Sequence, residues 1–244
     1  MILAARTALV TGGARRLGRA IALALAERGA RVAVHYRTSA TEGAALVAEI
    51  RARGGEAEGF AADLADAAAV EELARAVTAR FGGLDVLVNN ASVFYRTPLA
   101  TLGEGEWDEN LAVNLKAPYL LSLRLGREMR ARGAGKIVNI ADVAAFRPYR
   151  DYLPYCVSKA GLVALTQGLA RALAPAVQVN CIAPGPILPP AGATEAECAA
   201  LLAHTPLGRF GSPADVAAAV VYLVEGTDFV TGTTVVVDGG RVLA

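Results

Sequence analysis

Tyr155 and Lys159, with Asp142 upstream, are the side chains of this sequence best placed to do chemistry. The Tyr-x-x-x-Lys pair opens an apolar, helix-forming run, so both side chains lie on one face of the expected helix. An ammonium beside a phenol favours the phenolate. At roughly 7 Å and an effective dielectric constant near 20, the attraction is about 2.4 kcal/mol. We therefore expect Lys159 to lower the pKa of Tyr155 by at most about two units, toward the range of a general acid or base.

The spacing of this pair is weak support by itself, because a surface helix with a solvated lysine has the same pattern. The elements that carry the pair must decide between the two interpretations. At 244 residues the chain can bury a large core, and one α/β domain of this size is common.

Charge and composition exclude several classes of protein. A net charge of +1 gives no reason to expect nucleic acid or an anionic membrane as a partner, and no apolar run approaches a membrane span. The cysteines and histidines are too few and too scattered for a disulfide framework or a metal site: Cys156, Cys181, Cys198, His35 and His204. We expect a cytoplasmic enzyme without a metal.

A glycine-rich turn lies near the amino terminus. The apolar run 8–10 ends at Thr11-Gly12-Gly13, and a helical pattern follows from about residue 20 to 26. In such a strand–turn–helix unit, backbone N–H groups can bind a phosphate at the start of the helix. The usual dinucleotide turn has three glycines, whereas here Arg16 replaces the middle one.

The residues after the second expected strand, 31–36, indicate which dinucleotide binds. An Asp or Glu here would select the ribose hydroxyl of NAD, and neither is present. Arg37, Thr38 and Ser39 suit the 2′-phosphate of NADP through charge-assisted hydrogen bonds. An ordinary surface arginine is the alternative, and the glycine turn favours NADP.

The remaining pattern alternates strands and helices without a linker or repeat. We expect helices at 41–53, 66–80, 106–132, 155–173 and from Ser212, and strands at 57–61, 84–88, 136–140, 177–182 and 234–238. This order predicts an α/β fold: a single Rossmann-like domain over 1–244, a doubly wound parallel sheet with helices on both faces. The Pro- and Ala-rich segment 186–210 is an expected substrate lid.

Ligands of such sheets bind beyond the carboxyl ends of the strands. Polar and aromatic residues stand at these expected ends, among them Asn90, Ser92 and Phe94. Phe94 is either a loop anchor or a stacking surface for a flat ring.

In combination, these features make the chain resemble the short-chain dehydrogenase/reductase family over nearly its whole length. The matching motifs are TGGARRLG at 11–18, DL at 63–64, NNAS at 89–92, Asn114, Tyr155-x-x-x-Lys159 and PG at 184–185. The resemblance implies that Tyr155 exchanges the proton, that Lys159 binds the nicotinamide ribose and lowers the tyrosine pKa, and that Asn114 holds a relay water. Cofactor contacts are expected at Gly12, Arg16, Leu17, Tyr36, Arg37, Thr38, Ser39, Asp63, Leu64, Asn90, Ala91, Ser92, Tyr155, Lys159, Pro184, Gly185 and Ile187.

Asp142 departs from the family pattern, in which most members have serine. An ionised carboxylate only accepts hydrogen bonds and would repel a developing oxyanion, which argues against a simple ketone substrate. A pterin, which presents N–H donors, is compatible with it. With Arg16, the HYRTS run at 35–39 and Phe94, the chain resembles the pteridine reductase branch. Substrate contacts are then expected at Arg16, Ser92, Phe94, Asp142 and Tyr155.

These observations lead to an expected function. We expect NADPH-dependent reduction of a pterin or dihydrofolate-like C=N bond, with protonation by Tyr155 and Asp142. The first alternative is a 3-oxoacyl thioester reductase or another carbonyl reductase of the family. The second is a non-catalytic NADP-binding regulator. The resemblance implies a homotetramer, with the helices near 106–132 and 155–173 at one interface.

Overall fold

The computed structural model describes residues 1–189, 192 and 194–244. Their strands form one parallel sheet in the order β3-β2-β1-β4-β5-β6-β7. The strands are β1 (Thr7–Val10), β2 (Arg31–Tyr36), β3 (Ala57–Ala61), β4 (Val86–Asn89), β5 (Gly135–Ile140), β6 (Val177–Pro184) and β7 (Thr234–Val237). The order reverses between β1 and β4, as in a doubly wound sheet, so the predicted fold class is confirmed.

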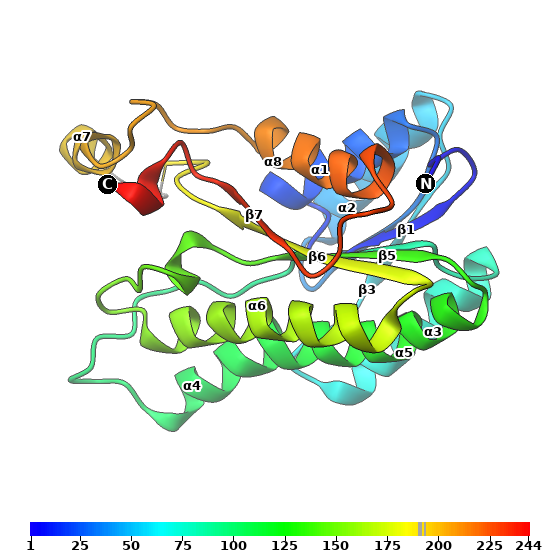
Figure 1. Cartoon of the computed structure of the whole chain (residues 1–244), viewed down its shortest axis with the longest axis horizontal. Coiled ribbons are helices and arrows are strands. Elements are labelled where there is room, and N and C mark those ends of the chain that lie inside the picture. Colours follow the sequence, from blue (N-terminus) through cyan, green and yellow to red (C-terminus); the bar gives the residue numbers. More distant parts are fainter. Residues whose placement is uncertain (190–191, 193) are drawn as a thin grey trace.

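Helices cover both faces of the sheet (Figure 1). One face carries α1 (Arg16–Glu27), α2 (Ala40–Ala52) and α8 (Pro213–Val221). The other carries α3 (Ala67–Phe81), α4 (Glu104–Leu111), α5 (Ala117–Ala131) and α6 (Leu153–Leu173). A further helix, α7 (Glu195–Ala203), lies near the C-terminus.

Alternation along the strands divides the core between these two layers. In β1, Ala8 and Val10 pack with Ile21 of α1, whereas Leu9 packs with Leu121 of α5 on the opposite face. Helices cover both faces of the central strands, and β1 and β4 are therefore buried along their whole length.

The expected helix over 106–132 is continuous but is not α-helical throughout. Helix α4 begins at Glu104, a π-helical turn spans Ala112–Lys116, and α5 continues to Ala131. The π turn contains Asn114 and directly precedes Pro118 near the start of α5. Single π turns within helices are frequent at functional sites, and periodicity alone does not reveal them.

Other expected boundaries shift by a few residues. Strand β4 begins at Val86 rather than at 84, because the Asp85 carboxylate accepts a hydrogen bond from the Thr7 backbone at 2.9 Å. Strand β6 extends to Pro184, and α6 begins at Leu153, with Pro154 in its first turn.

The glycine turn after β1 brings α1 close to the sheet. Gly12 has a left-handed backbone with φ of +61°, and a Cβ on Gly18 would lie 2.1 Å from the Gly12 carbonyl oxygen. Any side chain at Gly18 would therefore force α1 away from the turn. No helix in the described part of the chain is long and apolar enough to cross a membrane.

Candidate active site

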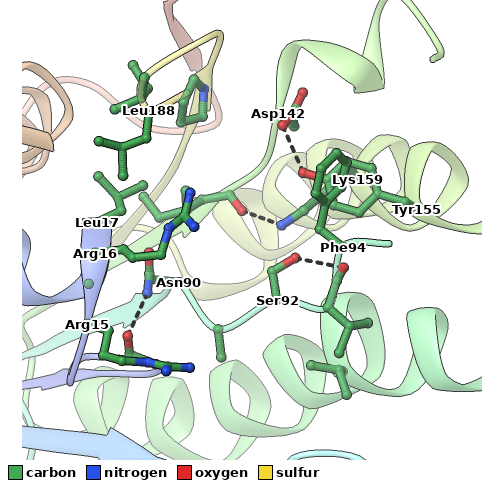
Figure 2. A pocket seen from close by; sticks show the side chains of 18 of the residues that line it. Arg15, Arg16, Leu17, Asn90, Ser92, Phe94, Asp142, Tyr155, Lys159 and Leu188 are labelled. Atoms are coloured by element: carbon green, nitrogen blue, oxygen red, sulfur yellow. Dashed lines mark hydrogen bonds between the residues drawn. The ribbon is translucent and has the colours of Figure 1, made fainter. Parts of the chain in front are cut away.

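A large cavity lies at the carboxyl ends of the strands, with a volume of about 890 Å³. It is lined by every residue for which sequence analysis predicted a cofactor or substrate contact. Arg16 and Leu17 come from the start of α1 on one side, and Asp142, Tyr155 and Lys159 face them from the other (Figure 2). Segments far apart in the chain thus meet around one space large enough for a dinucleotide and a second small molecule.

The Asp142 carboxylate is the centre of a hydrogen-bond network. Its Oδ2 accepts the Tyr155 hydroxyl at 2.8 Å (Figure 2), and its Oδ1 accepts the Tyr149 hydroxyl at 2.9 Å. Oδ1 also accepts the Ala144 N–H at 2.7 Å, which caps the short 3₁₀ turn after β5. An ionised carboxylate accepts about four hydrogen bonds, so these donors leave room for one more at Oδ2.

Burial has the largest effect on the pKa of Asp142 in this network. It raises the pKa of Asp142, and the hydrogen bonds from Ala144, Tyr155 and Tyr149 offset only part of that rise. At neutral pH, Asp142 is therefore protonated in a larger fraction of molecules than an exposed aspartate is.

The predicted lowering of the Tyr155 pKa is wrong for this structure. Burial raises the pKa well above 10.0, and the charge of Asp142 raises it further. The expectation placed Lys159 beside the phenol but took no account of burial or of a carboxylate in direct contact with the hydroxyl. Tyr155 is accordingly a proton donor here, directed at Asp142.

Lys159 lies behind the tyrosine. Its Nζ is 5.6 Å from the centre of the Tyr155 ring and donates to the Ile140 carbonyl oxygen at 2.9 Å. Burial lowers its pKa to about 8, against the opposing charge of Asp142. The ammonium is thus fixed in position next to the Tyr155 ring.

Aromatic rings form a wall next to this network. Phe94 stacks on Tyr152 with ring centres 4.6 Å apart and planes 10° from parallel, and its ring meets Tyr155 edge-on at 4.7 Å. Phe94 is 53% exposed and lines the cavity. A ring both partly exposed and fixed by neighbours is suited to stacking on a flat ligand.

Asn114 does not line the cavity but supports it from behind. Its Oδ1 accepts from the Ser92 hydroxyl at 3.1 Å and the Val93 N–H at 2.9 Å, and its Nδ2 donates to Ser158 at 3.1 Å. The side chain therefore joins the loop after β4 to the start of α6. Its predicted role in holding a relay water stays a prediction.

The opposite end of the cavity suits a diphosphate. Helix α1 has no side-chain cap on its first turn, so its amino end can bind an anion through free N–H groups. Arg16 lies in that turn with a left-handed φ of +50°, a costly conformation outside glycine that often marks functional residues. Asn90 fixes the adjoining glycine turn by donating to the Thr11 carbonyl oxygen at 2.8 Å.

The end of β2 carries positive charge and hydroxyl groups. Arg37 lies 3.9 Å from Glu109, and Arg15 lies 3.6 Å from Glu42, both as largely exposed and therefore weak pairs. The Ser39 hydroxyl caps nothing at the start of α2. These groups can turn to a ribose phosphate, so the donors present fit NADP.

Hydrogen bonds of the His35 ring fix the glycine turn in position. Its Nδ1 accepts the Gly12 N–H at 3.0 Å, so its Nε2 carries the proton and donates to the Ala62 carbonyl oxygen at 3.1 Å. Burial lowers the pKa of His35 and keeps the ring neutral.

The expected lid at 186–210 contributes several cavity residues. Ile187, Leu188 and Leu201 line the cavity, and α7 lies within the segment. Residues 190, 191 and 193 of the expected lid lie outside the described residues. Its movement over the site stays a prediction.

Sequence reasoning missed several cavity residues. Tyr149 and Tyr152 precede Tyr155 at regular intervals of three, a signal that was present in the sequence. Arg15, His35 and Arg241 also line the cavity, and of these Arg241 had no recognisable signal because it belongs to the carboxyl terminus.

Comparisons with known proteins identify relatives over the full length. The family model described as enoyl-(acyl carrier protein) reductase matches residues 12–241. A D-threitol dehydrogenase from Mycolicibacterium smegmatis is 39% identical, covering 96% of this chain and 92% of its own. The 3-oxoacyl-[acyl-carrier-protein] reductase FabG from Staphylococcus aureus is 37% identical, covering 96% and 97%.

A solved structure with nearly the same backbone is FolM alternative dihydrofolate reductase 1 from Brucella canis, complexed with NADP. It superimposes with a TM-score of 0.93 at 36% identity and covers 100% of this chain and 96% of its own. The relatives agree on the fold but differ in the substrates their names state, so overall identity does not choose among them.

Proposed function

The chain belongs to the short-chain dehydrogenase/reductase family of oxidoreductases, and we propose that it uses NADPH to reduce a pterin or dihydrofolate-like C=N bond. The observation that carries the proposal is the Asp142 carboxylate, which lines the cavity and hydrogen-bonds the Tyr155 hydroxyl. The likeness to an alternative dihydrofolate reductase bound to NADP supports the same substrate class.

Asp142 would orient the substrate ring. Its free lone pair on Oδ2 accepts one N–H of a pterin, and a second N–H can take the place of the Tyr155 hydroxyl when that group turns to the reacting nitrogen. A ketone oxygen would instead meet two oxygens that repel it. The carboxylate therefore selects nitrogen heterocycles with N–H donors.

Tyr155 would supply the proton. A nicotinamide bound in the cavity would supply the hydride for the carbon of the C=N bond. Tyr155 donates its proton to the nitrogen, and the buried Lys159 ammonium stabilises the phenolate that remains. After the product leaves, the Asp142 carboxylate, whose pKa burial raises, would take up a proton from water and pass it to the Tyr155 phenolate across the 2.8 Å hydrogen bond.

Phe94 would hold the ring flat. Its exposed face looks into the cavity while its other contacts, Tyr152 and Tyr155, fix its plane. A pterin placed against Phe94 would be held in one orientation and shielded from water on that face, which favours the reactive geometry.

For the cofactor, we propose NADP rather than NAD. Arg37, Thr38 and Ser39 stand where an acidic residue would select NAD, and Arg15 lies on the same side of the cavity. The uncapped start of α1 and Arg16 would bind the diphosphate.

A 3-oxoacyl thioester reductase is the second candidate, favoured by the 37% identity to FabG. Asp142 counts against it, because a developing alkoxide needs hydrogen-bond donors. A non-catalytic regulator is a third candidate. The assembled Tyr155, Lys159 and Asp142 in an open cavity count against it, because a regulator has no use for them.

We also propose a homotetramer. Exposed apolar side chains occur on the helices expected at an interface: Trp107 in α4, Tyr119 in α5, and Leu153 and Val157 in α6. Pairing of two such helical faces would bury them.

The substrate proposal is tested by following NADPH oxidation with dihydrobiopterin, dihydrofolate and an acetoacetyl thioester. We expect turnover of the pterins and a much lower kcat/KM for the thioester. Activity on the thioester alone would transfer the assignment to the second candidate. Tight NADP binding without turnover of any of these would favour the regulator.

A further inference from the structure

Four arginines line the cavity, and they differ in whether a carboxylate neutralises them. Arg15 pairs with Glu42 and Arg37 with Glu109. Among the residues that the structure describes, Arg16 and Arg241 make no ion pair. Arg16 belongs to the start of α1, where the cofactor diphosphate would lie. Arg241 is thus a second cation, for which the cofactor provides no evident partner.

Arg241 lies at the substrate end of the cavity. Its Nη1 donates to the Leu201 carbonyl oxygen of α7 at 2.8 Å. Its charge also acts on the Tyr149 hydroxyl: burial raises the pKa of Tyr149, and Arg241 opposes part of that rise. Tyr149 donates to Asp142, so Arg241 lies next to the Asp142 hydrogen-bond network that would hold the heterocycle.

The backbone around Arg241 is held firmly. The nearly buried Asp238 carboxylate accepts the N–H groups of Gly240 at 2.8 Å and Val242 at 2.7 Å, on either side of the arginine. Arg147 donates to the carbonyl oxygens of Arg241 and Ala244. Figure 1 shows the resulting C-terminal turn beside α7 at one end of the molecule. The side chain therefore projects from a fixed point rather than from a loose tail.

Most of the guanidinium is available to a ligand. The group has five N–H donors in a planar fork, and within the described part of the chain only the bond to Leu201 uses one. A half-buried cation of this kind gains most from a planar anion that takes two parallel hydrogen bonds, and a carboxylate matches that geometry.

We infer that Arg241 binds a carboxylate on the side chain of the substrate, so that the preferred substrate is a reduced pterin with an acidic tail, as in a dihydrofolate, rather than one with a neutral side chain. The inference rests on the proposed reduction of a pterin ring. It assigns the two ends of the substrate to different residues: the ring to Asp142 and Phe94, and the tail to Arg241.

The test compares three substrates in the wild type and the Arg241→Gln variant. Dihydrofolate carries the acidic tail, dihydropteroate amide has the benzoyl tail without any carboxylate, and dihydrobiopterin has a short neutral side chain. A hydrogen-bonded charge pair of about 1.5–3 kcal/mol corresponds to roughly 10- to 150-fold. We expect kcat/KM for dihydrofolate to fall by that factor, mainly through KM, with changes below about twofold for the other two.

Two further variants sharpen the comparison. Arg241→Lys keeps the charge without the fork and should restore part of the loss. Arg209→Gln removes an exposed arginine that is paired with Asp215 and does not line the cavity, and should leave all three substrates unchanged.

Each outcome has one meaning. An equal loss on all three substrates would show that Arg241 only supports α7, and an unchanged kcat/KM for dihydrofolate would show that it binds no tail; either result overturns the inference. In both cases turnover of dihydrobiopterin by the wild type still upholds the proposed function. If the wild type reduces none of the three, the proposed function fails and the tail assignment fails with it.

Discussion

Replacing Asp142 by asparagine removes the charge while keeping the size of the side chain and one carbonyl oxygen. In the wild type, one lone pair on Oδ2 is free and a second is released when Tyr155 turns away. A hydrogen bond to a charged group is worth about 1.5–3 kcal/mol, so losing one to two of them costs about 3 kcal/mol in the complex. We therefore expect kcat/KM for a dihydropterin to fall roughly 150-fold in Asp142→Asn.

The cofactor affinity serves as the internal control. Asp142 is not among the residues expected to contact the cofactor, so the Kd of NADPH, measured by fluorescence titration, should change by less than about twofold. Reduction of the pterin by Asp142→Asn within about threefold of the wild-type rate would contradict the role of the carboxylate. A loss of NADPH binding as large as the loss of turnover would contradict it too.

Stability shows whether the variant is folded. Burial raises the pKa of Asp142 from its unfolded value of 3.8. The folded state therefore binds this proton more tightly, and the contribution to stability is present below the unfolded pKa and is lost as the pH rises through the folded pKa. At neutral pH the carboxylate costs stability, so we expect Asp142→Asn to have a Tm at least as high as the wild type, with the difference increasing as the pH rises above about 4.

Asp142→Ser tests selectivity in the opposite direction. A serine hydroxyl can donate to a carbonyl oxygen, which a carboxylate cannot do. We expect this variant to lose pterin reduction while its ratio of thioester to pterin kcat/KM rises, and equal ratios in both proteins would contradict the role given to the carboxylate.

Three further predictions concern other parts of the cavity. Tyr155→Phe removes the proton donor and should lower kcat by about 10²- to 10⁴-fold with an unchanged Kd for NADPH; retained turnover would remove the assigned role. Arg37→Gln should raise the KM of NADPH about tenfold or more and leave that of NADH unchanged, and an equal effect on both would place the 2′-phosphate elsewhere. The lowered pKa of His35 means that its contribution to stability is present above 6.5 and is lost as the pH falls through the folded pKa. The wild-type Tm should therefore fall on acidification from about pH 7.5 to about pH 5 by more than that of His35→Gln, and parallel curves would exclude His35 as the cause.

Much of the site was predictable because chain order determines where parallel strands end. Residues such as Asn90, Asp142 and Gly185 follow different strands, and one sheet brings those strand ends to one edge. The regular alternation of apolar strands and amphipathic helices was enough to indicate that sheet. Motif spacing then placed Tyr155 and Lys159 on one helix face.

What escaped prediction depends on packing rather than on periodicity. The Tyr155 pKa follows from complete burial and from contact with a carboxylate thirteen positions earlier, neither of which the four-residue spacing to Lys159 contains. The π turn at Asn114 has the same apolar pattern as an α-helix. Arg241 reaches the cavity only because Asp238 and Arg147 hold the C-terminal turn against α7.

The orientation of a bound pterin tests the central claim most directly. In a crystal structure of the protein with NADP and a dihydropterin or methotrexate, we expect the ring to lie against Phe94 with two of its N–H groups on the Asp142 carboxylate. A ring bound elsewhere, or an Asp142 side chain turned out of the cavity and hydrogen-bonded only to protein, would contradict the account.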